Sequence, residues 1–179
     1  MNVLRLNRHR LSAMQTLHPD NQELSKIPSR RAGTATVELA LVMPLLLLLL
    51  MGIIEFGLLF EDYMILKNAA REGARTAATG ANTTAIADRV QDAAAKLPAE
   101  ELTITQQYGV YDEGSWSWYA LGDISSDEGV INDAPTGSFI RVEVSYPHHL
   151  VAGRIVPGLE DEPGSGSITL TGTATFRRE

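Results

Sequence analysis

One acidic side chain stands close to the start of the longest apolar stretch of this sequence. Glu38 follows Gly33 by five residues, and sixteen residues without a charge, Leu39–Ile54, come directly after it. A carboxylate near lipid is unfavourable, so an acid in this position is expected to have a partner and a function. The first question is therefore which positively charged group lies beside Glu38.

Two adjacent histidines, His148 and His149, are the residues most typical of a metal site. Adjacent residues of a strand point to opposite faces, and no third ligand lies at a suitable spacing. The acidic residues between positions 112 and 133 lack the spacing of a calcium loop. The sequence has no cysteine, no nucleophile motif and no phosphate-binding glycine loop. We therefore expect no catalytic residue, no metal and no cofactor, and a protein that is not an enzyme.

Three aromatic residues remain without an assigned chemistry. Trp116 and Trp118 are two positions apart, which places both rings on one face of a strand, and Tyr119 follows them. Such a pair belongs either to the core or to an exposed contact patch. We expect the core position.

The apolar stretch is long enough to cross a membrane. As a helix, Val37–Phe60 is roughly 36 Å long, and a bilayer core is about 30 Å thick. A secretory signal peptide has a shorter apolar region and a shorter basic region before it. The pattern predicts a single uncleaved transmembrane anchor rather than a signal peptide that is removed after its apolar part.

Charge gives the orientation of this anchor. Six basic and two acidic residues precede Gly33, whereas nine basic and eighteen acidic residues follow from Glu61 onward. Positive residues stay in the cytoplasm, so we expect the N-terminus inside and residues 61–179 outside. The acidic exported part argues against nucleic acid as a partner, and without cysteines it folds without disulfides.

The anchor segment resembles a known family. The points of likeness are Gly33, Glu38, Pro44, the "GIIEFG" of 52–57 and the "AAREGAR" of 69–75. In combination they resemble the TadE-like proteins, pseudopilins of tight-adherence (Flp-type) pilus systems, over roughly residues 33–80. The resemblance implies that a prepilin-peptidase-type protease cuts between Gly33 and Thr34, and that Glu38 is the pilin-type glutamate.

This resemblance supplies the positive group that Glu38 needs. Cleavage after Gly33 would give Thr34 a new ammonium group, and Glu38 lies one helical turn further on. Its carboxylate would offset that charge on its own chain or on a neighbouring subunit. The alternative is that Glu38 extends to the interface of an anchor that is never cut.

Small and apolar residues continue along one face of the helix with alternating spacings of four and three. They are Gly52, Phe56, Leu59, Tyr63, Leu66, Ala70, Gly73 and Ala77. Small residues allow close backbone approach, so this face is expected to pack on another helix within the membrane and on the protein's own domain beyond it. We include Gly57 in this packing set, and we expect a kink near Pro44. Glu55 is expected to extend toward headgroup water.

The remaining sequence predicts an α+β fold. We expect a basic leader at 1–33, a transmembrane helix at 34–60, its continuation at 61–79 and an exported domain at 80–179. A short amphipathic helix after Gly80 is followed by alternating segments typical of antiparallel strands near 102–108, 116–121, 139–146 and 167–176. Segment 123–137 is expected to be a loop, and 150–156 a buried connection or short helix.

Two functions are compatible with this pattern. The first is a pseudopilin of the cytoplasmic membrane that helps to assemble a tight-adherence pilus or a related secretion apparatus. Its partners would be the prepilin peptidase, other pilus-assembly or pseudopilin subunits and the lipid bilayer. The second is an anchored extracytoplasmic binding module that is never processed. The mature N-terminus distinguishes them.

Overall fold

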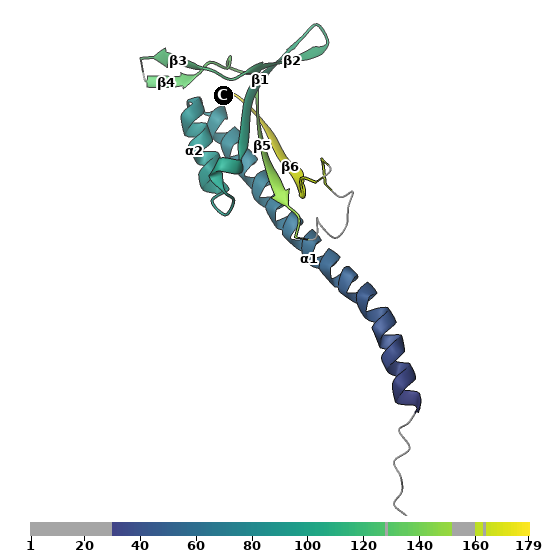
Figure 1. The fold of residues 1–179 in the computed structure, drawn as a ribbon. Coiled ribbons are helices and arrows are strands. Elements are labelled where there is room, and N and C mark those ends of the chain that lie inside the picture. Colours follow the sequence, from purple (N-terminus) through teal and green to yellow (C-terminus); the bar gives the residue numbers. More distant parts are fainter. Residues whose placement is uncertain (1–29, 128, 152–159, 163) are drawn as a thin grey trace, which may run out of the picture. The chain divides into compact units, whose positions relative to one another are not determined.

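The computed structural model describes residues 30–127, 129–151, 160–162 and 164–179, with side chains from Gly33 onward. The chain divides into two compact units, Met1–Pro44 and Leu45–Glu179. The connection expected at 150–156 lies mostly outside the described residues. Figure 1 labels the elements used below.

The first element, α1, spans Arg30–Ala78 and includes Pro44, and the boundary between the two units falls directly after this proline. Helix α2 spans Thr83–Ala93 and begins at Asn82, whose side chain accepts a hydrogen bond from the Ala85 amide at 2.8 Å. Asparagine is a favoured residue at this position because its side chain satisfies an amide of the first helical turn. A 3-10 turn, η1 (Ala99–Glu101), precedes the sheet.

Six strands follow in the described residues. They are β1 (Thr103–Asp112), β2 (Ser115–Ala120), β3 (Asp123–Ser126), β4 (Gly129–Asn132), β5 (Phe139–His149) and β6 (Ser167–Arg177). Four of them form an antiparallel sheet in the order β2-β1-β5-β6. The β1–β2 connection is the two-residue turn Glu113–Gly114, in which both residues have positive φ, as a tight hairpin turn requires. The α+β class is as the sequence predicts, and this hairpin joins the strands expected near 102–108 and 116–121.

The prediction of a loop over 123–137 was wrong in its first part, because β3 and β4 form a separate two-stranded sheet there. The sequence of this segment is acidic and contains glycine, and its apolar side chains Ile124 and Val130 are exposed. A short ribbon whose side chains are mostly exposed shows little of the alternation that identifies a strand in sequence.

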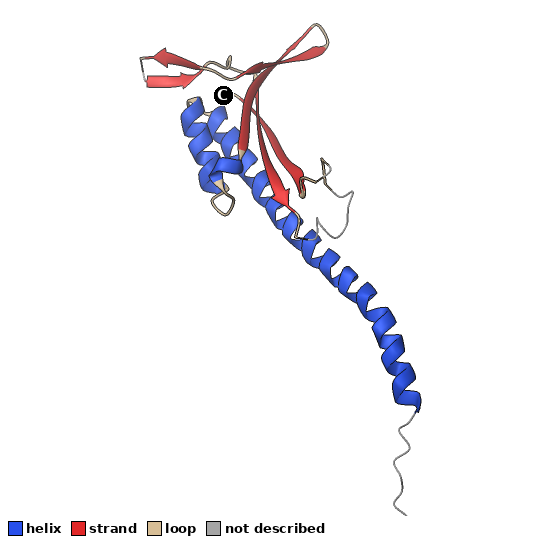
Figure 2. Ribbon diagram, in the orientation of Figure 1, coloured by secondary structure: helices blue, strands red, loops and turns tan. Residues whose placement is uncertain are grey.

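The core lies between one face of the four-stranded sheet and the two helices (Figure 2). Alternate residues of β5, Ile140, Val142 and Val144, are fully buried and meet residues of α1 and α2. Strand β6 approaches α1 closely at Gly172, where an added Cβ would lie 2.5 Å from the backbone carbon and oxygen of Leu66. Glycine is therefore the residue that this contact requires.

A buried amide ties the small sheet to the end of α1. The side chain of Asn132 donates hydrogen bonds to the carbonyls of Ala77 and Ala81, at 2.9 and 2.8 Å. Its oxygen accepts hydrogen bonds from the Arg178 guanidinium and the Ala134 amide. Because every polar atom of this side chain is satisfied, a fully buried amide is tolerated here.

Candidate functional site

The residues of the expected cleavage site lie in the first turns of α1. Gly33, Thr34 and Glu38 are all exposed. Among the described residues, a Cβ added at Gly33 would meet no atom within 4 Å, so packing against them does not explain the glycine. A protease that binds its substrate extended would first have to unwind the start of this helix.

The apolar part of α1 presents its side chains outward. The leucines from Leu45 to Leu50 are exposed, as are Ile53, Ile54 and Phe60. In the part of the chain that the structure describes, one helix is long and apolar enough to cross a membrane, and it lies near the N-terminus. This agrees with an N-terminal membrane anchor.

The face of small and apolar residues divides into two parts. Leu66, Ala70, Gly73 and Ala77 are buried in the protein's own core, as expected for the region beyond the membrane. Phe56, in contrast, is 73% exposed, and Cβ atoms added at Gly52 or Gly57 would meet nothing within 4 Å. The face is therefore open at Gly52 and Phe56 among the described residues, whereas Leu59 and Tyr63 pack against the core.

A cluster of three ionisable side chains lies where the end of β5 meets α1. Oδ2 of Asp62 and Nδ1 of His148 are joined by a hydrogen bond of 2.7 Å. The Nε2 atom of His148 lies 3.7 Å from Oε1 of Glu55, and the same Oε1 accepts the Val151 amide at 2.9 Å. Both Glu55 and His148 are more than nine-tenths buried.

This arrangement corrects the expectation for Glu55. Its carboxylate does not extend toward headgroup water but is buried beneath the end of the sheet. There it accepts a hydrogen bond from the Val151 amide and faces His148. Buried charges are tolerated when they are paired and hydrogen-bonded. The cluster therefore fastens the exported domain to α1 at the end of its long apolar stretch.

Replacing Glu55 by alanine is expected to lower the free energy of unfolding of the exported domain by about 1–3 kcal/mol, because the buried carboxylate is removed and the Val151 amide loses its hydrogen-bond acceptor. Glu55→Gln is the matched control, since it keeps an oxygen acceptor and the volume, and we expect a smaller loss. Denaturant unfolding followed by tryptophan fluorescence measures both. Equal stability of Glu55→Ala and the unmodified chain would contradict a role in fastening.

The second histidine belongs to a different environment. His149 is exposed, and its Nε2 lies 3.2 Å from a carboxylate oxygen of Glu101. The two histidines thus point to opposite faces of β5, as the sequence predicts. Among the residues that the structure describes, no group of three or more acidic or histidine side chains is arranged to hold a metal ion.

The expectation that the tryptophans belong to the core was wrong. Trp116 is 46% exposed and Tyr119 is 51% exposed, although the two tryptophan rings do share one face, with centroids 5.9 Å apart. Trp118 lies flat over Gly109, and the Arg141 guanidinium stacks on its ring at 3.8 Å. We call Tyr111, Trp116, Trp118 and Phe139 the aromatic cluster.

The fold and these features define a class of protein, namely an N-terminal apolar helix that continues into a small α+β domain. A comparison with family models identifies a family that the N-terminal part of the chain resembles. The model described as TadE-like protein matches residues 33–75, which is less than a quarter of the 179 residues. The match confirms the TadE-like resemblance of the anchor segment. No curated protein and no solved structure matches the chain.

The structure also contains site residues that sequence reasoning missed. Asp62 and His148 are brought together from positions 86 residues apart, and the pairing has no local sequence signal. A partial signal exists in α1, because Glu55 and Asp62 are seven residues apart and therefore lie on the same helix face as Leu59 and Leu66. An acid on the packing face of a helix indicates a buried partner.

Proposed function

We propose that this protein is a membrane-anchored pseudopilin that helps to assemble a tight-adherence (Flp-type) pilus or a related secretion apparatus. The observation that carries the proposal is the TadE-like match, because it spans both the cleavage motif at Gly33 and the whole apolar part of α1. The mechanism needs no catalysis by this chain. It consists of processing, anchoring and packing of helices.

Three glycines on α1 support an external role for this helix. Glycine in a helix interior is about 1 kcal/mol less favourable than alanine. Gly33, Gly52 and Gly57 have open space around their missing side chains, so the fold gains nothing from them. A protease cleft at Gly33 and close contact with neighbouring helices at Gly52 and Gly57 would each make use of the missing side chain.

The proposed location is the cytoplasmic membrane, with the N-terminus inside and the domain outside. Basic residues predominate before Gly33 and acidic residues after Glu61, which supports this orientation. After cleavage the apolar helix stays attached to the domain, so the protein remains in the membrane. Glu38 then lies one turn from the new amine of Thr34 and offsets its charge.

The alternative function is an unprocessed anchored binding module outside the membrane. The exposed aromatic cluster favours it, because aromatic residues are enriched in the centres of binding surfaces. The two functions differ in whether the anchor is cut and in whether its free face contacts other subunits.

Single cysteines test orientation and assembly together, because the natural chain has none. We expect Phe56→Cys, on the free face of α1, to form cross-links to pilus-assembly subunits in membranes that contain the complete system. Thr175→Cys, at an exposed position of strand β6, is the matched control and should not form them. We also expect an impermeant maleimide added to spheroplasts to label Thr175→Cys. Labelling only after lysis would contradict the orientation, and equal cross-linking of both variants would contradict assembly through the helix.

A further inference from the structure

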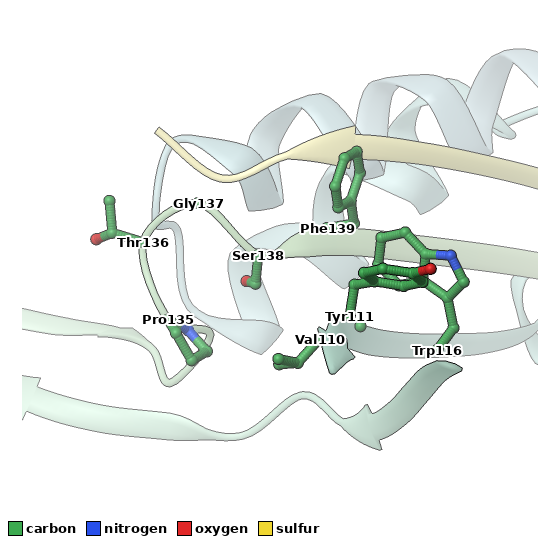
Figure 3. A pocket seen from close by; sticks show the side chains of 9 residues that line it. Val110, Tyr111, Trp116, Pro135, Thr136, Gly137, Ser138 and Phe139 are labelled. Atoms are coloured by element: carbon green, nitrogen blue, oxygen red, sulfur yellow. The ribbon is translucent and has the colours of Figure 1, made fainter. Parts of the chain in front are cut away.

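A pocket lies beside the aromatic cluster, where the β1–β2 hairpin meets the loop that precedes β5. Its volume is about 310 Å³, and none of the residues that line it is charged. Figure 3 shows the rings of Tyr111, Trp116 and Phe139 gathered on one side and the loop residues Pro135 to Ser138 on the other. The pocket is separate from both the anchor helix and the Glu55 cluster.

One wall of this pocket is aromatic. The ring of Trp116 lies 5.2 Å from that of Tyr111 and 5.1 Å from that of Phe139, measured between centroids. All three side chains are exposed. The hairpin turn and the pairing of Tyr111 with Trp116 across β1 and β2 hold two of them in place. The wall is therefore preformed and open to a ligand.

The opposite wall carries an unused hydroxyl. Ser138 is 8% exposed, and its Oγ has no hydrogen-bond partner in the structure. Its backbone is satisfied, since its amide donates to the Pro135 carbonyl at 3.0 Å and its carbonyl accepts the Arg178 amide at 2.8 Å. A buried polar atom without a partner is unfavourable, so a ligand that offers a hydrogen bond to Ser138 gains from the contact.

We propose that this pocket binds a neutral sugar residue. A pyranose has a face of C–H groups that packs on aromatic rings, and its rim of hydroxyls both donates and accepts. The aromatic wall matches the first property, and the hydroxyl of Ser138 matches the second. The absence of charge from the lining argues for a neutral ligand in a domain whose sequence is strongly acidic.

The size of the pocket favours a sugar over a peptide. Proline-rich peptides bind along extended aromatic grooves. A volume of about 310 Å³ is near the lower limit of small-molecule pockets, which span about 300–1,000 Å³. The proposal concerns the exported domain alone and does not depend on cleavage of the anchor.

Tryptophan fluorescence provides a local measurement, because the chain has two tryptophans and both belong to the aromatic cluster. The full chain in a detergent without a sugar headgroup is titrated with maltotriose, cellotriose and chitotriose, and separately with decaproline. We expect at least one trisaccharide to shift the emission with a Kd of about 1 mM or tighter. No shift with any trisaccharide, or a shift with decaproline alone, would overturn the proposal.

Three variants separate binding from folding. Ser138→Ala is expected to weaken sugar binding about three- to ten-fold and to leave the unfolding midpoint unchanged, because its hydroxyl has no partner in the folded chain. Trp116→Ala should weaken binding at least about ten-fold. Tyr119→Ala is the matched control, since Tyr119 is similarly exposed but does not line the pocket. Equal weakening by Tyr119→Ala, or unchanged binding by Ser138→Ala, would overturn the assignment.

Discussion

Replacing Gly172 by alanine is expected to destabilise the exported domain by at least about 3 kcal/mol, at the upper end of the usual effects of overpacking. The added Cβ would lie 2.5 Å from the backbone carbon and oxygen of Leu66 and 2.7 Å from the backbone nitrogen of Lys67. These are backbone atoms of α1 and cannot move aside as a side chain can. Denaturant unfolding followed by tryptophan fluorescence measures the loss.

A loss of this size is a large part of the stability of a typical domain, which is about 5–15 kcal/mol. Thr175→Ala on the same strand is the matched control, because Thr175 is exposed, and its effect should stay within about 0.5 kcal/mol. Equal stability of Gly172→Ala and Thr175→Ala would show that β6 does not lie against α1 as described.

The second large effect is expected at the cleavage site. In a host that carries the prepilin peptidase, Gly33→Phe should abolish removal of residues 1–33 and leave membrane insertion intact. The structure gives no packing role to Gly33, so an intramolecular effect of the substitution is not expected. A bulky side chain would instead obstruct the protease at the bond to be cut. Gel mobility and intact mass distinguish the two forms.

Gly57→Phe is the matched control for this experiment, because Gly57 is an open glycine of the same helix but lies far along the chain from the cut. It should be processed normally. Glu38→Ala is expected either to spare cleavage and impair assembly or to affect both, since the proposed partner of Glu38 exists only once Thr34 carries an amine. Normal processing of Gly33→Phe would contradict a pilin-type cleavage after this residue.

The sequence was sufficient for those parts of the fold that are determined by local patterns. Alternation in 139–146 predicted that Val142, Val144 and Tyr146 share a buried face, and all three are buried. The turn at Glu113–Gly114 was predictable from Gly114, because glycine adopts positive φ readily and lies here between two alternating segments. The amphipathic pattern after Gly80 likewise predicted helix α2, whose buried face contains Ile86 and Val90.

Features that depend on distant residues could not be predicted in this way. Glu55 looked like an interfacial acid because nothing near it in sequence indicates that Val151 and His148 cover it. Trp116 looked like a core residue because its strand has the right spacing. The inner face of the sheet, however, is filled by α1 and α2, and the tryptophans belong to the other face. The topology of the whole domain determines which face of a strand is buried. The alternation of apolar and polar residues in a single strand does not reveal that topology.

The match to TadE-like proteins confirms the family resemblance of the anchor segment, whereas the pseudopilin role is a proposal. That proposal depends most on one covalent event, the cleavage of the bond between Gly33 and Thr34. N-terminal sequencing of the membrane-extracted protein, from a host that carries the peptidase, tests it directly. The predicted result is a mature chain that begins at Thr34. A chain that still begins at Met1 would contradict the pseudopilin assignment and leave the anchored binding module.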